Sequence, residues 1–63
     1  MHLREQVENC CGKLIEIEWQ FALSNLNREI EYKCNQIPSV QEMRNILINN
    51  VLFYRKNKNL MEG

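Results

Sequence analysis

Three cysteines are the residues of this chain best suited to chemistry: Cys10, Cys11 and Cys34. Three thiolates suit a soft metal ion such as Zn²⁺ or Cu⁺. Metal-binding cysteines usually stand in C-x-x-C loops with a fourth ligand, whereas two of these are adjacent and the single histidine, His2, stands apart. We therefore expect the cysteines to be small apolar fillers, with no metal and no cofactor, and keep a thiol or soft-metal sensor as an alternative function.

Acid–base catalysis would need carboxylates that converge on one cleft. Four of the six glutamates of the first half occur in pairs two residues apart, Glu16 with Glu18 and Glu29 with Glu31. On a helix, residues two apart point about 200° away from each other, so these carboxylates are expected to be solvated. With one histidine, no aspartate and no nucleophile motif, the sequence predicts a protein that is not an enzyme.

A basic cluster lies near the end of the sequence: Arg55, Lys56 and Lys58, preceded by the aromatic pair Phe53-Tyr54. Cations can contact phosphates and aromatic rings can stack on bases, so a small nucleic-acid regulator is an alternative function. Eight Lys and Arg balance eight Asp and Glu, however, so the chain has no overall basic field. The cluster is better explained as cations that complement the negative end of a helix dipole.

A length of 63 residues is enough for one small domain, which we expect over residues 1–63. Apolar residues make up 44% of the chain, and only two glycines and one proline interrupt it, which favours a compact all-helical protein. No apolar leader follows Met1, and the longest apolar run is the four residues from Val51 to Tyr54, too short to span a membrane. The odd cysteine count and the missing leader predict a cytoplasmic protein in a reducing compartment.

One proline divides the sequence into two predicted helices. Pro38 disfavours helical geometry in the residue before it, so the first helix is expected over residues 3–34. The segment Ser39-Val40-Gln41-Glu42 matches the S-x-x-E capping box and starts a second helix over residues 39–60. The connection near residues 35–38 is short, so the predicted fold is an antiparallel two-helix hairpin.

The predicted first helix carries more apolar surface than its hairpin mate can cover. Its apolar residues form two stripes about 150° apart. A second helix of about 22 residues is about 33 Å long and reaches back only to about Leu14. Residues 1–13 would then have no partner within the chain, although Gly12 leaves open a kink or a shorter separate N-terminal helix. The uncovered stripe follows a spacing of four and three residues and comprises Leu3, Val7, Cys10, Leu14, Ile17 and Phe21.

An uncovered apolar stripe predicts a protein that binds another protein through a helix face. Self-association into a dimeric four-helix assembly, or the binding of a heterologous helical partner, would bury this stripe. Because aromatic residues are favoured at interfaces, Phe53 joins the stripe among the predicted partner-binding residues. In size and layout the chain resembles the small hairpin chaperones and co-chaperones that hold a secretion or assembly component, and this resemblance implies protein binding.

Overall fold

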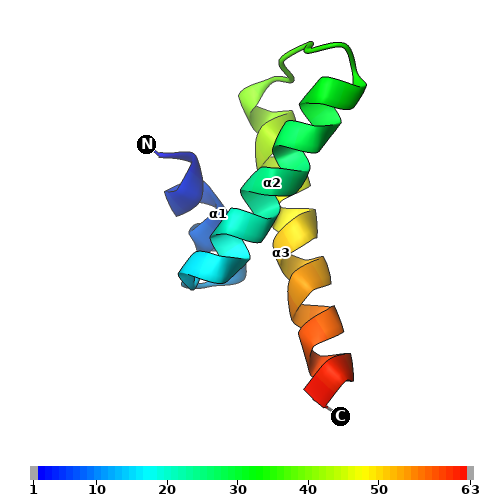
Figure 1. Cartoon of the computed structure of the whole chain (residues 1–63). Coiled ribbons are helices and arrows are strands. Elements are labelled where there is room, and N and C mark those ends of the chain that lie inside the picture. The colour runs from blue at the N-terminus through cyan, green and yellow to red at the C-terminus, as the bar shows by residue number, and fades with distance from the viewer. Residues whose placement is uncertain (1, 63) are drawn as a thin grey trace.

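Three helices, not two, make up the part of the chain that the structure describes. The computed structural model describes residues 2–62, apart from the side chains of residues 59–62. Its helices are α1 (Leu3–Cys11), α2 (Glu16–Tyr32) and α3 (Val40–Glu62), and the described residues include no strand (Figure 1). None of these helices is both long enough and apolar enough to cross a membrane. The predicted all-helical class is confirmed, whereas the predicted two-helix hairpin is wrong, because residues 3–34 do not form one helix.

The interruption lies at Gly12. This glycine has φ +82° and ψ 179°, a conformation that is nearly exclusive to glycine. Its N–H ends α1 with a 2.8 Å hydrogen bond to the carbonyl oxygen of Glu8. The backbone is non-helical through Ile15, whose N–H donates a 3.0 Å hydrogen bond to the Glu18 carboxylate at the start of α2. The chain therefore turns back on itself between α1 and α2.

Replacing Gly12 with alanine is expected to lower the free energy of unfolding by about 1–2 kcal/mol. A methyl group at this position would meet no atom within 4 Å, so the cost is backbone strain rather than a steric clash. Urea denaturation of Gly12→Ala and the wild type measures the difference. Ser24→Ala, a substitution at an exposed helical position, serves as the control and should stay within about 0.5 kcal/mol. An unchanged stability in Gly12→Ala would contradict this role of the glycine.

The α2–α3 hairpin closes through two residues in the left-handed region. Cys34 and Asn35 have φ of +60° and +63°, and the Asn35 N–H donates a 2.9 Å hydrogen bond to the carbonyl oxygen of Ile30 at the end of α2. Before α3, the Ser39 hydroxyl accepts a 3.2 Å hydrogen bond from the Glu42 N–H, which confirms the predicted cap. Cys34 is exposed in this turn and is not part of a core stripe.

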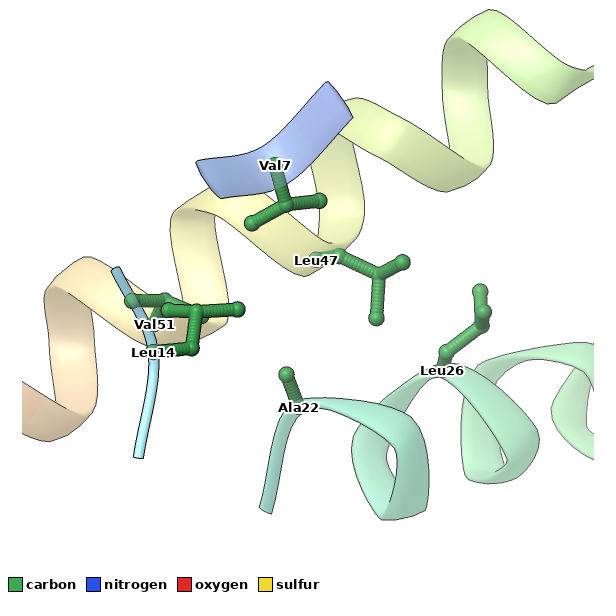
Figure 2. Close-up of a cluster of buried hydrophobic side chains, with 6 residues drawn as sticks. All are labelled: Val7, Leu14, Ala22, Leu26, Leu47 and Val51. Carbon is green, nitrogen blue, oxygen red and sulfur yellow. The ribbon is translucent and has the colours of Figure 1, made fainter. Parts of the chain in front are cut away.

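The core is shared by all three helices and the loop between α1 and α2. Because the chain reverses at residues 12–15, α1 folds back against α3 and Val7 lies near Leu47 (Figure 2). The prediction that residues 1–13 have no partner within the chain is therefore wrong. α3 is the longest helix, and its C-terminal turns extend past the other two helices (Figure 1). The buried apolar side chains are Val7, Leu14, Ala22, Leu26, Leu47 and Val51.

Candidate functional site

The structure divides the predicted partner-binding stripe into an inward and an outward part. Val7 and Leu14 are buried, with exposed fractions of 0% and 3%, and Leu3 packs against the same core. The return of α1 onto α3 buries apolar side chains that a single long helix would have left in solvent. Val7 and Leu14 are therefore core residues of the chain itself and are not accessible to a partner.

The outward part of the stripe joins an aromatic cluster. Ile17 and Phe53 keep exposed fractions of 59% and 57%. The half-buried Phe21 stacks against Phe53, with ring centroids 6.4 Å apart and an interplanar angle of 11°, and tilts against Tyr54 with centroids 5.2 Å apart. Ile17 lies one helical turn before Phe21 on α2. We call Ile17, Phe21, Phe53 and Tyr54 the aromatic patch.

The aromatic patch faces away from α1. On the other side of α2, the Arg4 guanidinium of α1 lies 5.7 Å from the centre of the Trp19 ring, and Trp19 lines a groove together with residues of α1. Trp19 is two residues from both Ile17 and Phe21, which places those two side chains about 200° around the helix from it. α1 therefore covers one side of the α2–α3 hairpin and leaves the side with the aromatic patch uncovered.

This uncovered side continues along both helices at spacings of three and four residues, and we call it the open face. Its eight positions include only one charged residue, Arg28, although 25% of the chain is charged. A groove of about 410 Å³ runs along its α2 half, from Ile17 past Ser24 to Arg28, with Tyr54 on the α3 side. The open face comprises Ile17, Phe21, Ser24 and Arg28 on α2, and Ile46, Asn50, Phe53 and Asn57 on α3.

A pair of asparagines joins the two helices in the middle of this region. The Asn25 side-chain amide donates a 2.9 Å hydrogen bond to the Asn50 side-chain oxygen, and the Asn50 amide donates a 2.7 Å hydrogen bond to the carbonyl oxygen of Ile46. Sequence reasoning missed this pair, because the two residues are 25 positions apart. The only signal available was their helical spacing, since Asn25 follows Phe21 by four residues and Asn50 follows Ile46 by four.

Arg55 is directed into the loop between α1 and α2 and does not form part of a cationic surface. Its guanidinium donates hydrogen bonds to the Glu18 carboxylate at 2.5 and 3.3 Å and to the carbonyl oxygens of Cys11 and Lys13 at 2.6 and 3.3 Å. Glu18 is 6% exposed and also receives the Ile15 N–H. This one side chain therefore ties α3 to the end of α1 and to the start of α2.

Two side chains of α1 hold the same loop from the other end. The Glu8 carboxylate accepts a 2.8 Å hydrogen bond from the Leu14 N–H. Arg4 donates to the carbonyl oxygen of Leu14 at 3.3 Å and pairs with the Glu16 carboxylate at 3.2 Å. The loop is thus fixed by side chains of all three helices, which keeps α1 on its own side of the hairpin.

The predicted basic cluster is not gathered on one surface. Arg55 is engaged by Glu18, while Lys56 and Lys58 are exposed. The two lysines are two residues apart on α3 and so point about 200° away from each other. Arg55, Lys56 and Lys58 therefore do not form the continuous cationic stripe that phosphate binding favours.

The Glu18 carboxyl has a pKa below its ordinary value. The main cause is the hydrogen bond from Arg55, helped by the N–H of Ile15 and by the charges of Arg55 and Lys58, while burial acts in the opposite direction. The folded protein therefore favours the ionised carboxylate. This contribution to stability is fully present above the ordinary carboxyl pKa of about 4.3 and is lost as the pH falls through the lower pKa of the folded state.

Acidification is accordingly expected to destabilise the protein below about pH 4.3. Chemical denaturation at a series of pH values between 7 and 3 measures the change. Glu18→Gln should reduce the pH dependence but not abolish it, because the pKa of Glu16 is also lowered, chiefly by a hydrogen bond from Gln20 and then by Arg4. Identical pH profiles for Glu18→Gln and the wild type would contradict the role assigned to Glu18.

The three cysteines lie at two separate places in the chain. Cys10 and Cys11 end α1, and Cys34 lies in the α2–α3 turn; Cys10 and Cys34 are exposed. Among the described residues, no group of three His, Cys, Asp or Glu side chains is arranged to hold a metal ion. Burial raises the pKa of the Cys11 thiol, although the Arg55 guanidinium partly offsets this rise. Cys11 thus lacks the lowered pKa that is typical of reactive thiols.

Comparison with protein-family models, with curated proteins and with solved structures finds no match to this chain. The open face and its aromatic patch are therefore the observations on which a proposal of function can rest.

Proposed function

We propose that this chain is a non-enzymatic protein-binding module, a small helical adaptor or chaperone-like protein, that binds through its open face. The observation that carries the proposal is the exposed aromatic patch on a face with a single charged residue. Protein interfaces are depleted in charge at their centre and enriched in aromatic residues and arginine. The open face has this composition, with the aromatic patch at one end and Arg28 at the other.

The shape of the open face suits a helical partner. The face lies between two antiparallel helices, and a groove between helices can accept the apolar side of a third. Single exposed apolar residues are common on protein surfaces, whereas contiguous ones mark binding sites. Phe21 links Phe53 and Tyr54 through ring contacts, so these residues form one surface. The proposed site therefore retains Ile17, Phe21 and Phe53 from the partner-binding residues predicted by the sequence.

Photo-crosslinking tests this function in extracts of cells that express the chain. A benzoylphenylalanine replaces Phe53 on the open face or, as the control, its neighbour Leu52, which is 51% exposed but lies about 100° further round α3. We expect protein adducts from position 53 and few from position 52.

Competition by unlabelled protein makes the test specific for the open face. Ile15 and Ile17 form a matched pair, with exposed fractions of 52% and 59%, and only Ile17 lies on the open face. Added wild type or Ile15→Ser should suppress the adducts from position 53, while Ile17→Ser should not. Equal adducts from positions 52 and 53, or equal competition by the two serine variants, would contradict the proposal.

A further inference from the structure

We infer that the open face binds a second copy of this chain, related to the first by a two-fold axis that runs parallel to the Asn25–Asn50 hydrogen bond, just outside the surface of the open face. The inference rests on the proposed function and adds the identity and orientation of the partner. It follows from the order of residues along the face, from the chemistry at its two ends and from its size.

Four of the eight residues of the open face, Phe21, Arg28, Ile46 and Phe53, are placed symmetrically about one level of the hairpin. Phe21 and Arg28 are seven residues apart on α2, about 10.5 Å along the helix, and their midpoint falls between residues 24 and 25. Ile46 and Phe53 are also seven apart on α3, with their midpoint between residues 49 and 50. The 2.9 Å hydrogen bond between Asn25 and Asn50 joins these two midpoints.

An axis parallel to this bond and just above the open face turns one copy onto the other, with each helix antiparallel to its own counterpart. Arg28 then lies opposite the partner's Phe21, and Phe53 lies opposite the partner's Ile46. In the resulting dimer, α2 and α3 of both copies lie together at the centre. Each of these four helices is antiparallel to its neighbours, as in four-helix bundles. An isologous contact of this kind uses the same surface on both copies and closes at two chains.

The two ends of the face are chemically complementary. Arg28 is exposed and makes no ion pair among the side chains that the structure describes. A guanidinium over an aromatic ring is stabilised by a cation–π interaction, and the partner's Phe21, stacked with Phe53, supplies that ring. Phe21 and Arg28 of one copy thus find their complement in Arg28 and Phe21 of an identical chain.

The centre of the face fits the axis. Ser24 is small and exposed, which permits close approach of the two α2 helices. An asparagine amide has two donors and an acceptor, and Asn25 uses one donor on Asn50, so the rest of its amide can pair with the partner's Asn25. A buried asparagine pair fixes the register of packed helices.

The size of the face sets the expected affinity. A standard interface covers roughly 800 Å² of each partner, about a sixth of the 4793 Å² accessible surface of this chain. The open face spans about 16 Å along two helices about 9 Å apart, which is at the small end of interface sizes. We therefore expect weak dimerisation, with half of the chains paired at about 10–100 µM.

Sedimentation equilibrium from 10 µM to 1 mM tests the association. The average mass of the wild type should rise with concentration from near 7.6 kDa toward twice that mass. Phe53→Glu should weaken pairing at least tenfold. Arg28→Gln removes both symmetry-related cation–π contacts and should weaken pairing about fivefold, the equivalent of about 1 kcal/mol for the two contacts together. Leu52→Glu should pair as the wild type does. Circular dichroism of each variant establishes that its helices remain intact.

Disulfide trapping tests the orientation. In a background with Cys10→Ser, Cys11→Ala and Cys34→Asn, oxidation of Ser24→Cys should link two copies, since residue 24 lies beside the axis. Asn27→Cys, exposed on the same helix but outside the open face, should not form this link.

A mass of 7.6 kDa at 1 mM, full pairing of Phe53→Glu, or equal trapping through positions 24 and 27 would overturn the inference. The chain could instead be a monomer whose position 53 still captures another protein, with capture suppressed by Ile15→Ser and not by Ile17→Ser. That result rejects the second copy and leaves the proposed function standing. A monomer without such capture rejects both.

Discussion

Leu47→Ala is expected to lower the free energy of unfolding by about 3–4 kcal/mol, within the range measured for leucine truncations in cores. Leu47 is fully buried near the middle of α3, with Val7 of α1 on one side and Ala22 and Leu26 of α2 on the other (Figure 2). Truncation therefore leaves a cavity where all three helices meet. A chain of this length has a total stability of about 3–9 kcal/mol, so this loss removes a large part of it.

Thermal denaturation followed by circular dichroism measures this effect, and a fall in Tm of roughly 15–25 °C is expected. Leu52→Ala is the matched control, because Leu52 is on the same helix and 51% exposed, and its substitution should cost less than about 1 kcal/mol. Equal losses in the two variants would mean that Leu47 is not at the centre of the core.

Arg55→Met is expected to cost about 2–3 kcal/mol at pH 7. The substitution keeps much of the apolar stem but leaves the Glu18 carboxylate buried without its cation, and removes the hydrogen bonds to the carbonyl oxygens of Cys11 and Lys13. Urea denaturation measures the loss. Removing one partner of a buried pair is costly mainly because the other charge stays behind.

Two further variants assign this loss to the ion pair. Lys56→Met removes an exposed neighbouring cation and should change stability by less than about 0.5 kcal/mol. In the double variant Arg55→Met/Glu18→Gln, the uncharged amide should recover part of the stability lost in Arg55→Met. A loss in Arg55→Met no larger than that in Lys56→Met would contradict the bracing of the loop by Arg55.

The hairpin of α2 and α3 could be predicted from local signals, whereas a separate α1 could be predicted only as an alternative. Pro38 and the cap at Ser39 mark the start of α3 within one residue. The break before α2 was predicted only as an alternative, a kink or a shorter separate helix at Gly12, because residues 12–15 replace about one helical turn. The spacing of four and three residues therefore continues from Val7 to Ile17 as though the helix were unbroken.

Local signals for the break are nevertheless present. Gly12 is a helix terminator, and Glu16 and Glu18 supply the acidic first turn that is typical of a helix start. The regular apolar stripe nevertheless favoured one continuous helix over these local signals. The hydrogen bonds of Arg55 to residues 37 to 44 positions away have no counterpart in any local pattern.

The candidate site was predictable in part. The exposure of Ile17 and Phe53 agrees with their assignment to a binding surface, while the burial of Val7 and Leu14 does not. The spacing of apolar residues shows which of them share a side of a helix, but it does not show which side a third helix will cover. That choice depends on the loop at residues 12–15, which sends α1 back over α3.

The division of the apolar stripe into buried and exposed residues is tested most directly by nuclear magnetic resonance with a soluble paramagnetic agent. At a protein concentration of about 5 µM, below the expected pairing range, the methyl groups of Val7 and Leu14 should be as protected as those of Leu47, while those of Ile17 relax strongly. At 1 mM, Ile17 should gain protection and Ile15 should not. Methyl groups of Val7 and Leu14 that relax as strongly as those of Ile17 in the dilute sample would contradict the three-helix core and the open face defined by it.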